Sequence, residues 1–206
     1  MNVYLTVLFV SFGALLAEAN QKCHGHPRMY NGKQCASTTR YADRHKGACG
    51  CGPHDTDNQF PWNSNGLVAA ANQNLFDSSG GTWCGPSCGK CVRLTTTGGF
   101  VKGQGGATGE GKSKIFMITN LCPNVWPNLS WCNQRGHNGV NQYGYAAHFD
   151  LENGHTQITG MGWDNSEVTW EWANCDEGHS QDGRTPNYGM YQQCQCKKNR
   201  RHTGKK

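Results

Sequence analysis

The chain has 206 residues, a formal net charge of +5, a hydrophobic fraction of 35% and 28 glycines. This length suits a single domain and leaves too little chain for several. Beyond the first twenty residues, no segment approaches the roughly twenty consecutive apolar residues that a membrane helix needs, which argues against a membrane partner. Six of the basic residues lie at 197–206, where almost nothing is apolar. We expect a disordered, solvated tail there, with weak anchoring to an acidic polysaccharide or another anionic surface as the alternative.

The first nineteen residues have the pattern of a secretory signal peptide. An apolar run at 3–16 is followed by Ala17-Glu18-Ala19, a small-x-small cleavage pattern. The run is the length of a signal-peptide core and too short to span a bilayer. We therefore expect a signal peptide at 1–19 and a secreted, extracellular product that begins near Asn20.

All 12 cysteines lie after this leader. In an oxidising compartment an even number predicts six disulfides, although the pairing cannot be derived from the sequence. The spacing within 49–51, 84–91 and 194–196 also fits metal ligands. Export argues against that alternative, so we expect no metal and no organic cofactor.

Taken in chain order, short β-branched or aromatic runs predict strands at 38–42, 91–97, 114–119, 147–151, 156–161 and 167–172. An alanine-rich stretch after Ser64 or Asn65 predicts one helix over 66–76. The glycine-rich stretch 98–111 predicts a long mobile loop. Many short strands with little helix predict a mostly β domain at 20–196, followed by the tail at 197–206.

Two short segments about a hundred residues apart each carry an aspartate, Asp43 and Asp150. Because side chains alternate along a strand, Thr39, Tyr41 and Asp43 share one face, and His148 and Asp150 share another. Phe149 and Leu151 then point into the core, so that Asp150 faces a groove or solvent. Glu152 shares the face of Asp150 and either raises the pKa of that acid or faces solvent. Glu167 is typical of a solvated charge at a strand edge.

The two aspartate segments and the residues between them resemble a known family. Residues 39–43 (TRYAD) and 148–150 (HFD), with 61–76 and 83–94 between them, resemble glycoside hydrolase family 45. These are small secreted endoglucanases that cut β-1,4-glucan with inversion, and the pattern is most similar to the animal branch, as in molluscs. Residues 47–52, 119–123, 131–132 and 148–150 also resemble expansins and barwin-like domains. Both resemblances imply a six-stranded double-psi β-barrel with one or two short helices and long disulfide-linked loops.

The resemblance to family 45 implies a role for each of several residues. Asp150 is expected to be the general acid and Asp43 the general base of an inverting reaction, which requires about 6.5–9.5 Å between the carboxyl groups. The assisting or substrate-binding residues are expected to be Thr39, Tyr41, Asn120 and His148. From the residues alone, simpler roles stay open: a turn for Asp43, the core for Tyr41 and an ordinary strand hydrogen bond for His148. Trp62, Trp126 and Trp131 are further candidates for sugar contacts.

The function that these features favour is a secreted endo-β-1,4-glucanase, or cellulase, whose partner is a β-1,4-glucan. The first alternative is a non-hydrolytic, expansin-like protein that binds glucan and loosens cell walls. Expansins lack the base in the first segment, so Asp43 favours the hydrolase. A barwin-like module that binds chitin or nucleic acid has only the basic tail in its favour. We therefore expect no nucleic-acid partner, and we expect a monomer.

Overall fold

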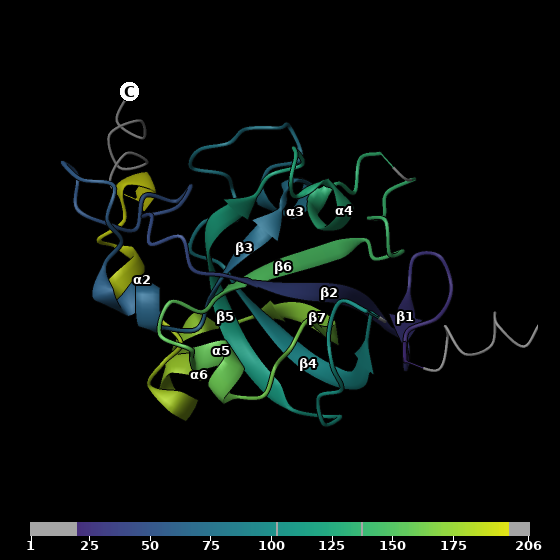
Figure 1. The fold of residues 1–206 in the computed structure, drawn as a ribbon. Helices are drawn as coiled ribbons and strands as arrows, with labels where there is room; N and C mark the ends of the chain where they lie inside the picture. Colours follow the sequence, from purple (N-terminus) through teal and green to yellow (C-terminus); the bar gives the residue numbers. More distant parts are fainter. Residues whose placement is uncertain (1–19, 102, 137, 198–206) are drawn as a thin grey trace, which may run out of the picture.

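The computed structural model describes residues 20–101, 103–136 and 138–197. The predicted signal peptide at 1–19 and the predicted tail beyond Lys197 lie outside the described residues. Within them the chain is mostly β, as expected, with short helices around the sheet (Figure 1). None of the helices in the described part of the chain combines the length and the apolar character that crossing a membrane requires.

The described residues form one seven-stranded sheet in the order β1-β2-β6-β3-β5-β4-β7, and β2 also pairs with β7. From β2 to β7, every strand is therefore hydrogen-bonded to a neighbour on both sides. The strands are β1 (Met29–Tyr30), β2 (Lys33–Tyr41), β3 (Val68–Asn72), β4 (Cys91–Phe100), β5 (Ser113–Cys122), β6 (Ala147–Glu152) and β7 (Ser166–Ala173). Five of the six predicted strands are thus confirmed.

The short helices lie at the ends of the strands and between them. They are α2 (Pro61–Asn65), α3 (Gln73–Phe76), α4 (Leu129–Cys132), α5 (Gln157–Gly160), α6 (Cys175–Asp182) and α7 (Tyr188–Tyr191). Pro61 occupies the first turn of α2, where a missing N–H costs nothing.

The predicted helix over 66–76 is wrong for most of its length, because residues 68–72 form β3. All five β3 residues are buried, and β3 pairs with β5 on one side and β6 on the other. Alanine favours a helix when a segment is alone. Here two neighbouring strands satisfy the backbone, and small side chains fit the crowded interior, so tertiary pairing overrides the local preference. Only the end of the predicted helix, α3, is helical.

The predicted strand at 156–161 is also wrong, because this segment contains α5. Thr156 adopts a left-handed conformation, with φ at 57°. The Asn153 side-chain oxygen accepts hydrogen bonds from the backbone N–H groups of Ile158 and Thr159. This capping arrangement turns the chain and satisfies the first turn of the helix.

The predicted glycine-rich loop at 98–111 is shorter than expected, because β4 continues to Phe100. Thr108 in the remaining loop is buried, and its hydroxyl donates to the Gly162 carbonyl at 3.1 Å. The loop is therefore attached to the segment that precedes β7.

All twelve cysteines are paired, which confirms the six expected disulfides. The pairs are Cys23–Cys35, Cys49–Cys88, Cys51–Cys194, Cys84–Cys196, Cys91–Cys175 and Cys122–Cys132. Two of them link the last described residues to the loops at 49–51 and 84–88. The segment around Cys194 and Cys196 is therefore fixed to these loops by covalent bonds, each of which typically contributes about 2–4 kcal/mol.

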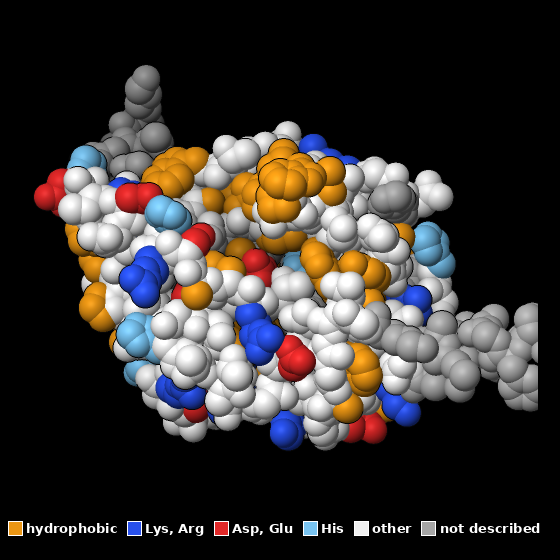
Figure 2. All heavy atoms as spheres, viewed as in Figure 1, with side chains coloured by type: hydrophobic (Ala, Val, Ile, Leu, Met, Phe, Trp, Pro, Cys, Tyr) orange, Lys and Arg blue, Asp and Glu red, His pale blue; other side chains and the backbone are white. Residues whose placement is uncertain are grey.

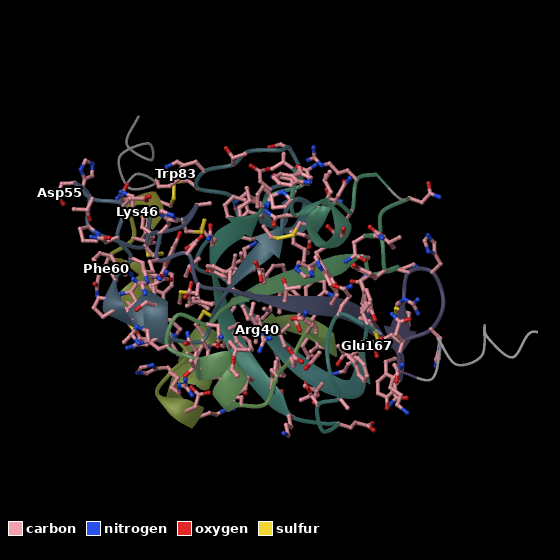
Figure 3. All side chains as sticks on the ribbon, viewed as in Figure 1. Arg40, Lys46, Asp55, Phe60, Trp83 and Glu167 are labelled. Atoms are coloured by element: carbon pink, nitrogen blue, oxygen red, sulfur yellow. A yellow bond between two sulfur atoms is a disulfide. The ribbon has the colours of Figure 1, made fainter. Side chains whose placement is uncertain are left out.

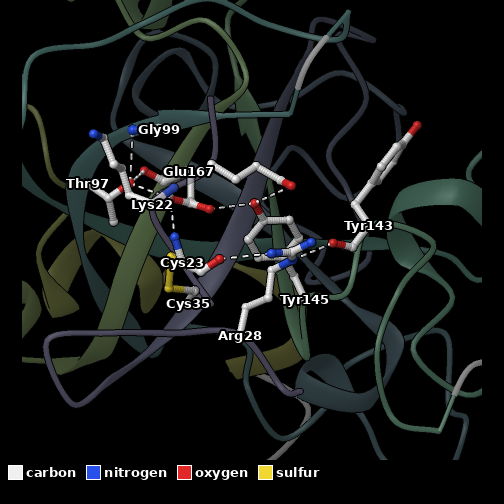
Figure 4. Close-up of a disulfide and its surroundings, with 10 residues drawn as sticks. Lys22, Cys23, Arg28, Cys35, Thr97, Gly99, Tyr143, Tyr145 and Glu167 are labelled. Atoms are coloured by element: carbon white, nitrogen blue, oxygen red, sulfur yellow. Dashed lines mark hydrogen bonds between the residues drawn. A yellow bond between two sulfur atoms is a disulfide. The ribbon is translucent and has the colours of Figure 1, made fainter. Parts of the chain in front are cut away.

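Glu167 differs from its prediction as a solvated charge, since only 1% of the residue is exposed. Its carboxylate accepts hydrogen bonds from the backbone N–H groups of Lys22 and Cys23, from Thr97 and from Tyr145 (Figure 4). Four donors offset the cost of burying the charge. This cluster attaches the first described residues to the start of β7.

Candidate active site

One pocket of about 180 Å³ brings four of the residues singled out by sequence together: Tyr41, Asp43, Asn120 and Asp150. The remaining lining residues are Ala70, Leu121, Cys122, Pro123 and Asn128. Figure 2 shows a hollow on this face, with an acidic side chain inside it and hydrophobic side chains around it. Residues of β2, β5 and β6 therefore line one groove.

Pairing of the strands sets the position of Asp150. In the parallel pair β2–β6, Thr39 is the register partner of Asp150, and Ala70 of β3 lies opposite on the other side. Phe149 and Leu151 are fully buried in the core, as the alternation predicted. On the other strand, Arg40 points away from the groove and pairs with Asp164 at 2.7 Å (Figure 3). The predicted faces of both segments are thus confirmed.

Burial raises the pKa of Asp150 to about 6. The hydroxyl of Thr39 donates to Asp150 Oδ1 at 2.7 Å and opposes this shift, because it stabilises the charged form. The negative charge of Asp43 adds to the increase. Asp150 therefore holds its proton in mildly acidic solution, where an ordinary aspartate is ionised.

A chain of buried hydrogen bonds leads from Asp150 into the interior. Thr39 contacts His148 Nε2 at 3.0 Å, and His148 Nδ1 contacts the Ser37 hydroxyl at 2.9 Å. Asn141 Nδ2 donates to the same hydroxyl at 3.0 Å. Each member of the chain thus contacts the next without an intervening gap.

The two ends of this chain, Asn141 and Thr39, set its direction. Asn141 Oδ1 accepts the backbone N–H groups of Tyr143 and Tyr145, so Nδ2 must face Ser37 as a donor. Thr39 donates its one hydroxyl hydrogen to Asp150 Oδ1, so it must accept from His148 Nε2–H. The ring is neutral because burial lowers its pKa, so its Nδ1 accepts from the Ser37 hydroxyl. The proton of the neutral acid therefore belongs on Oδ2.

His148 is fully buried, and burial lowers its pKa to about 3. The ring is consequently neutral, as the direction of the hydrogen-bond chain requires. Its centroid lies 5.5 Å from the ring of Trp131, and its backbone N–H donates to Asn72 Oδ1. His148 hydrogen-bonds Thr39 from the interior side and does not line the pocket.

Asp43 lies in a different environment, two residues after the end of β2. The residue is exposed, and its Oδ1 accepts the backbone N–H of His45 at 3.0 Å. The turn role that the sequence left open for Asp43 is therefore present. No hydrogen bond from a described residue reaches Oδ2, so this oxygen is accessible to water.

Tyr41 packs against the buried cluster of Ala70, Cys122 and Cys132, so the core role is present as well. Its ring also lines the pocket. Burial raises the pKa of Tyr41 well above 10, and the charges of three carboxyl groups, Glu152 first, act in the same direction. The phenol therefore stays neutral and keeps its O–H as a hydrogen-bond donor.

Asn120 is held by the backbone on both sides. Its Oδ1 accepts the N–H groups of Ala48 and Leu121, each at 2.8 Å, which leaves the Nδ2 group as the available donor. Gly47 allows this approach. A Cβ atom there would lie 2.8 Å from Asn120 Cγ, and its φ of 69° favours glycine.

A compact group of Cys122, Cys132 and His148 has the arrangement of metal ligands. The two sulfurs are bonded to each other in a disulfide, so they offer no thiolate to an ion.

Three parts of the site were missed by the sequence analysis. Ser37 follows the same alternation as Thr39 and Tyr41, so its face was available from the pattern. Asn141 precedes β6 in an irregular segment, and Gly47 and Ala48 lie in a loop. Their roles depend on contacts between distant segments, for which the local sequence carries no signal.

Of the proposed sugar contacts, Trp126 is the most exposed, at 83%. Trp131 packs on Tyr143 with centroids 4.2 Å apart, and Trp62 stacks on Phe60 at 5.9 Å. Trp126 therefore offers the most open ring, in the segment between Pro123 and Asn128 of the pocket.

Comparison with known proteins gives several matches. The family model described as EXPB1-like domain 1 matches residues 36–181. An endoglucanase of Mytilus edulis is 63% identical over 86% of this chain and 98% of its own length. Endoglucanase-5 of Hypocrea jecorina is 50% identical over 56% of this chain and 48% of its own length.

Solved structures agree with these matches. The β-1,4-D-endoglucanase Cel45A of the blue mussel Mytilus edulis superposes with a TM-score of 0.83, covering 86% of this chain and 99% of its own. The GH45 endoglucanase EG27II in complex with cellobiose has 47% identity and a TM-score of 0.76, with 86% and 98% of the two chains covered. By sequence identity, coverage and fold, this chain belongs to the endoglucanases of glycoside hydrolase family 45.

Proposed function

We propose that this chain hydrolyses internal β-1,4-glucosidic bonds of cellulose-like glucans with inversion at the anomeric carbon. The observation that carries the proposal is the shared pocket, in which two aspartates have opposite environments. Asp150 is partly buried and hydrogen-bonded by Thr39, whereas Asp43 is exposed and held by a turn. Membership of the endoglucanase family supports the same substrate class.

In the proposed reaction, Asp150 is the general acid. Its Oδ1 is occupied by Thr39, so the proton on Oδ2 is the one transferred to the glycosidic oxygen as the bond breaks. A pKa of about 6 keeps the group protonated below that pH.

Asp43 is the proposed general base. It removes a proton from a water molecule that attacks the opposite face of the sugar, so the new C–O bond forms with inversion. After the reaction Asp150 is ionised and Asp43 is protonated, and exchange with solvent restores both. Neutral Tyr41 and the Asn120 amide are proposed to bind the sugar hydroxyls or the water between them.

Two further expectations belong with this proposal. The double pairing of β2, with β6 and with β7, supports the six-stranded double-psi β-barrel expected from the resemblance. Six disulfides support export to an oxidising compartment, and the expected monomer stays part of the proposal.

The proposal is tested with carboxymethylcellulose and the purified protein. We expect new reducing ends, and we expect Asp43→Asn and Asp150→Asn each to abolish their release while both variants remain folded. Proton NMR of fresh products from a soluble cello-oligosaccharide should show the α-anomer first. Appearance of the β-anomer first would exclude inversion, and full activity in either variant would remove that aspartate from the mechanism.

A second candidate is non-hydrolytic binding and loosening of cell-wall glucan. The match of residues 36–181 to an expansin-type family model favours it. In that case the protein would weaken cellulose paper without releasing reducing ends, and Asp43→Asn would leave this weakening unchanged. The accessible Asp43 beside Asp150 makes hydrolysis the better-supported function.

A further inference from the structure

A buried acid close to the groove, Glu152, has no role in the mechanism proposed above. Glu152 is the last residue of β6 and is 0% exposed. Its register partner in β2 is Tyr41, and Asp43 follows Tyr41 by two residues. Glu152 therefore lies beside the end of β2, which leads into the proposed base.

The contacts of Glu152 are incomplete for an ionised carboxylate. Oε1 accepts the backbone N–H of Gly154 at 2.9 Å, whereas Oε2 is buried without a hydrogen-bond partner among the described residues. The carboxyl group lies directly against this glycine, since a Cβ at Gly154 would lie 2.7 Å from Oε1. A buried charge with an unsatisfied oxygen is costly, and a carboxyl group avoids this cost by keeping its proton.

Among the described residues, the groups that act on Glu152 include no positive charge. Toward it, β2 presents Tyr41 and then Asp43, the segment before α2 presents Gln59, and β6 itself carries Asp150. Within the described part of the chain, no ion pair includes Glu152. Exposed His155 instead contacts the Ser64 hydroxyl.

Gln59 is a polar neighbour of the Glu152 carboxyl group. Its Oε1 accepts from Asn63 Nδ2 at 2.6 Å, whereas its Nε2 is buried without a partner. The side chains of Gln59 and Tyr41 both act on Glu152 and stabilise its charged form. Burial outweighs them and, together with the charge of Asp43, raises the pKa of Glu152 to about 7.

We propose that Glu152 is a positioning residue of the active site and carries a proton in the working enzyme. The neutral carboxyl group holds Tyr41 in place. Asp43 is then the ionised carboxylate at this end of the groove. An ionised Glu152 would instead place a second negative charge next to the base and disfavour its ionisation. Glu152 touches no substrate in this role, which it exerts through Tyr41 and Asp43. The inference rests on the proposed function.

The first test is a titration without substrate. Carboxyl ¹³C NMR of protein labelled at glutamate would follow Glu152, whose signal is identified by its absence in Glu152→Gln. We expect its midpoint to lie well above that of an ordinary glutamate, about 4.3. We also expect the midpoint to fall in Asp43→Asn, because the neighbouring charge is gone. A midpoint near the ordinary value, or one unchanged in Asp43→Asn, would overturn the proposal.

The second test compares two substitutions at pH 5. Glutamine resembles the neutral acid, so Glu152→Gln should keep kcat/KM within about threefold of the wild-type value, whereas Glu152→Ala should lose about tenfold or more, mainly in kcat. Glu171→Gln, which neutralises an exposed carboxylate on β7, is the control and should change neither value. Equal damage in Glu152→Gln and Glu152→Ala would mean that the charged form is required, against the proposal.

The two tests also separate this inference from the proposed function. If the wild-type protein released no reducing ends, the hydrolase assignment would fail while the titration remained a valid measurement of the coupling between Glu152 and Asp43. If hydrolysis were present without coupling, only the role of Glu152 would be lost.

Discussion

The two sides of the groove differ in how they hold an aspartate. Asp150 lies in a central strand, partly buried, with one oxygen bound by Thr39 at the end of a directed chain of hydrogen bonds. Asp43 lies in an exposed turn after a strand, with one oxygen on the backbone of His45. Burial thus raises the pKa of the aspartate in the strand, Asp150. The surroundings, not the residue type, assign the proposed acid and base.

The largest expected effect is the loss of kcat on removing either carboxylate, and a change of leaving group tells the acid from the base. With a glucan substrate, Asp150→Asn and Asp43→Asn should each reduce kcat by about 10²–10⁴-fold. With an aryl cello-oligoside whose dinitrophenolate leaves without protonation, Asp150→Asn should recover most of its activity, whereas Asp43→Asn should not. Release of the phenolate, measured by absorbance, gives both rates. Recovery in Asp43→Asn instead would exchange the two roles.

The next effect concerns stability. The pKa of Asp150 is about 6 in the folded chain and ordinary in the unfolded chain, so the folded state binds more protons between these values. Stability contributed at this residue is therefore present at low pH and is lost as pH rises from about 4 to 6, by up to about 3 kcal/mol. Asp150→Asn should then be more stable than the wild type at pH 8 and nearly equal to it at pH 4. Urea unfolding at both pH values measures the difference, and parallel behaviour of the two proteins would contradict it.

A smaller effect should follow from the hydroxyl of Thr39. It stabilises the charged form of Asp150, so Thr39→Val should raise the pKa of the acid by about one unit. Because activity requires the protonated acid, the falling limb of the kcat/KM profile, expected near pH 6, should move to higher pH. Thr39→Ser keeps the donor and is the matched control. A limb that does not move would show that another group controls it.

The smallest expected effect is on KM, and it concerns Trp126 at the edge of the groove. Trp126 is 83% exposed, and we expect Trp126→Ala to raise KM for a polymeric glucan about threefold while leaving kcat and the melting temperature unchanged. Val125→Ala, at a neighbouring exposed position, is the control. An equal KM for the wild type and Trp126→Ala would remove this ring from substrate binding.

The floor of the groove could be predicted from sequence better than its supports. Strict alternation placed Thr39 and Tyr41 on one face of the first segment and His148 and Asp150 on one face of the second, and it sent Phe149 into the core, because a strand has only two faces. The same reasoning failed for β3, where alanines satisfy a buried strand as readily as a helix. Disulfide pairing and the contact between Asn141 and Ser37 depend on which distant segments meet, and periodicity contains no such information. Glu152 had two possible environments in the sequence, and burial decides between them.

The covalent attachment of the chain end has a consequence for when the groove can exist. Ala48, which holds Asn120, precedes Cys49 and Cys51, and this short loop receives Cys194 through a disulfide and the Cys196 backbone through a hydrogen bond. The residue separation across the Cys51–Cys194 bond is 143. The loop that holds Asn120 therefore receives this crosslink only after Cys194 has been synthesised and oxidised. A chain that stops short of Cys194 should keep this side of the groove without its covalent brace.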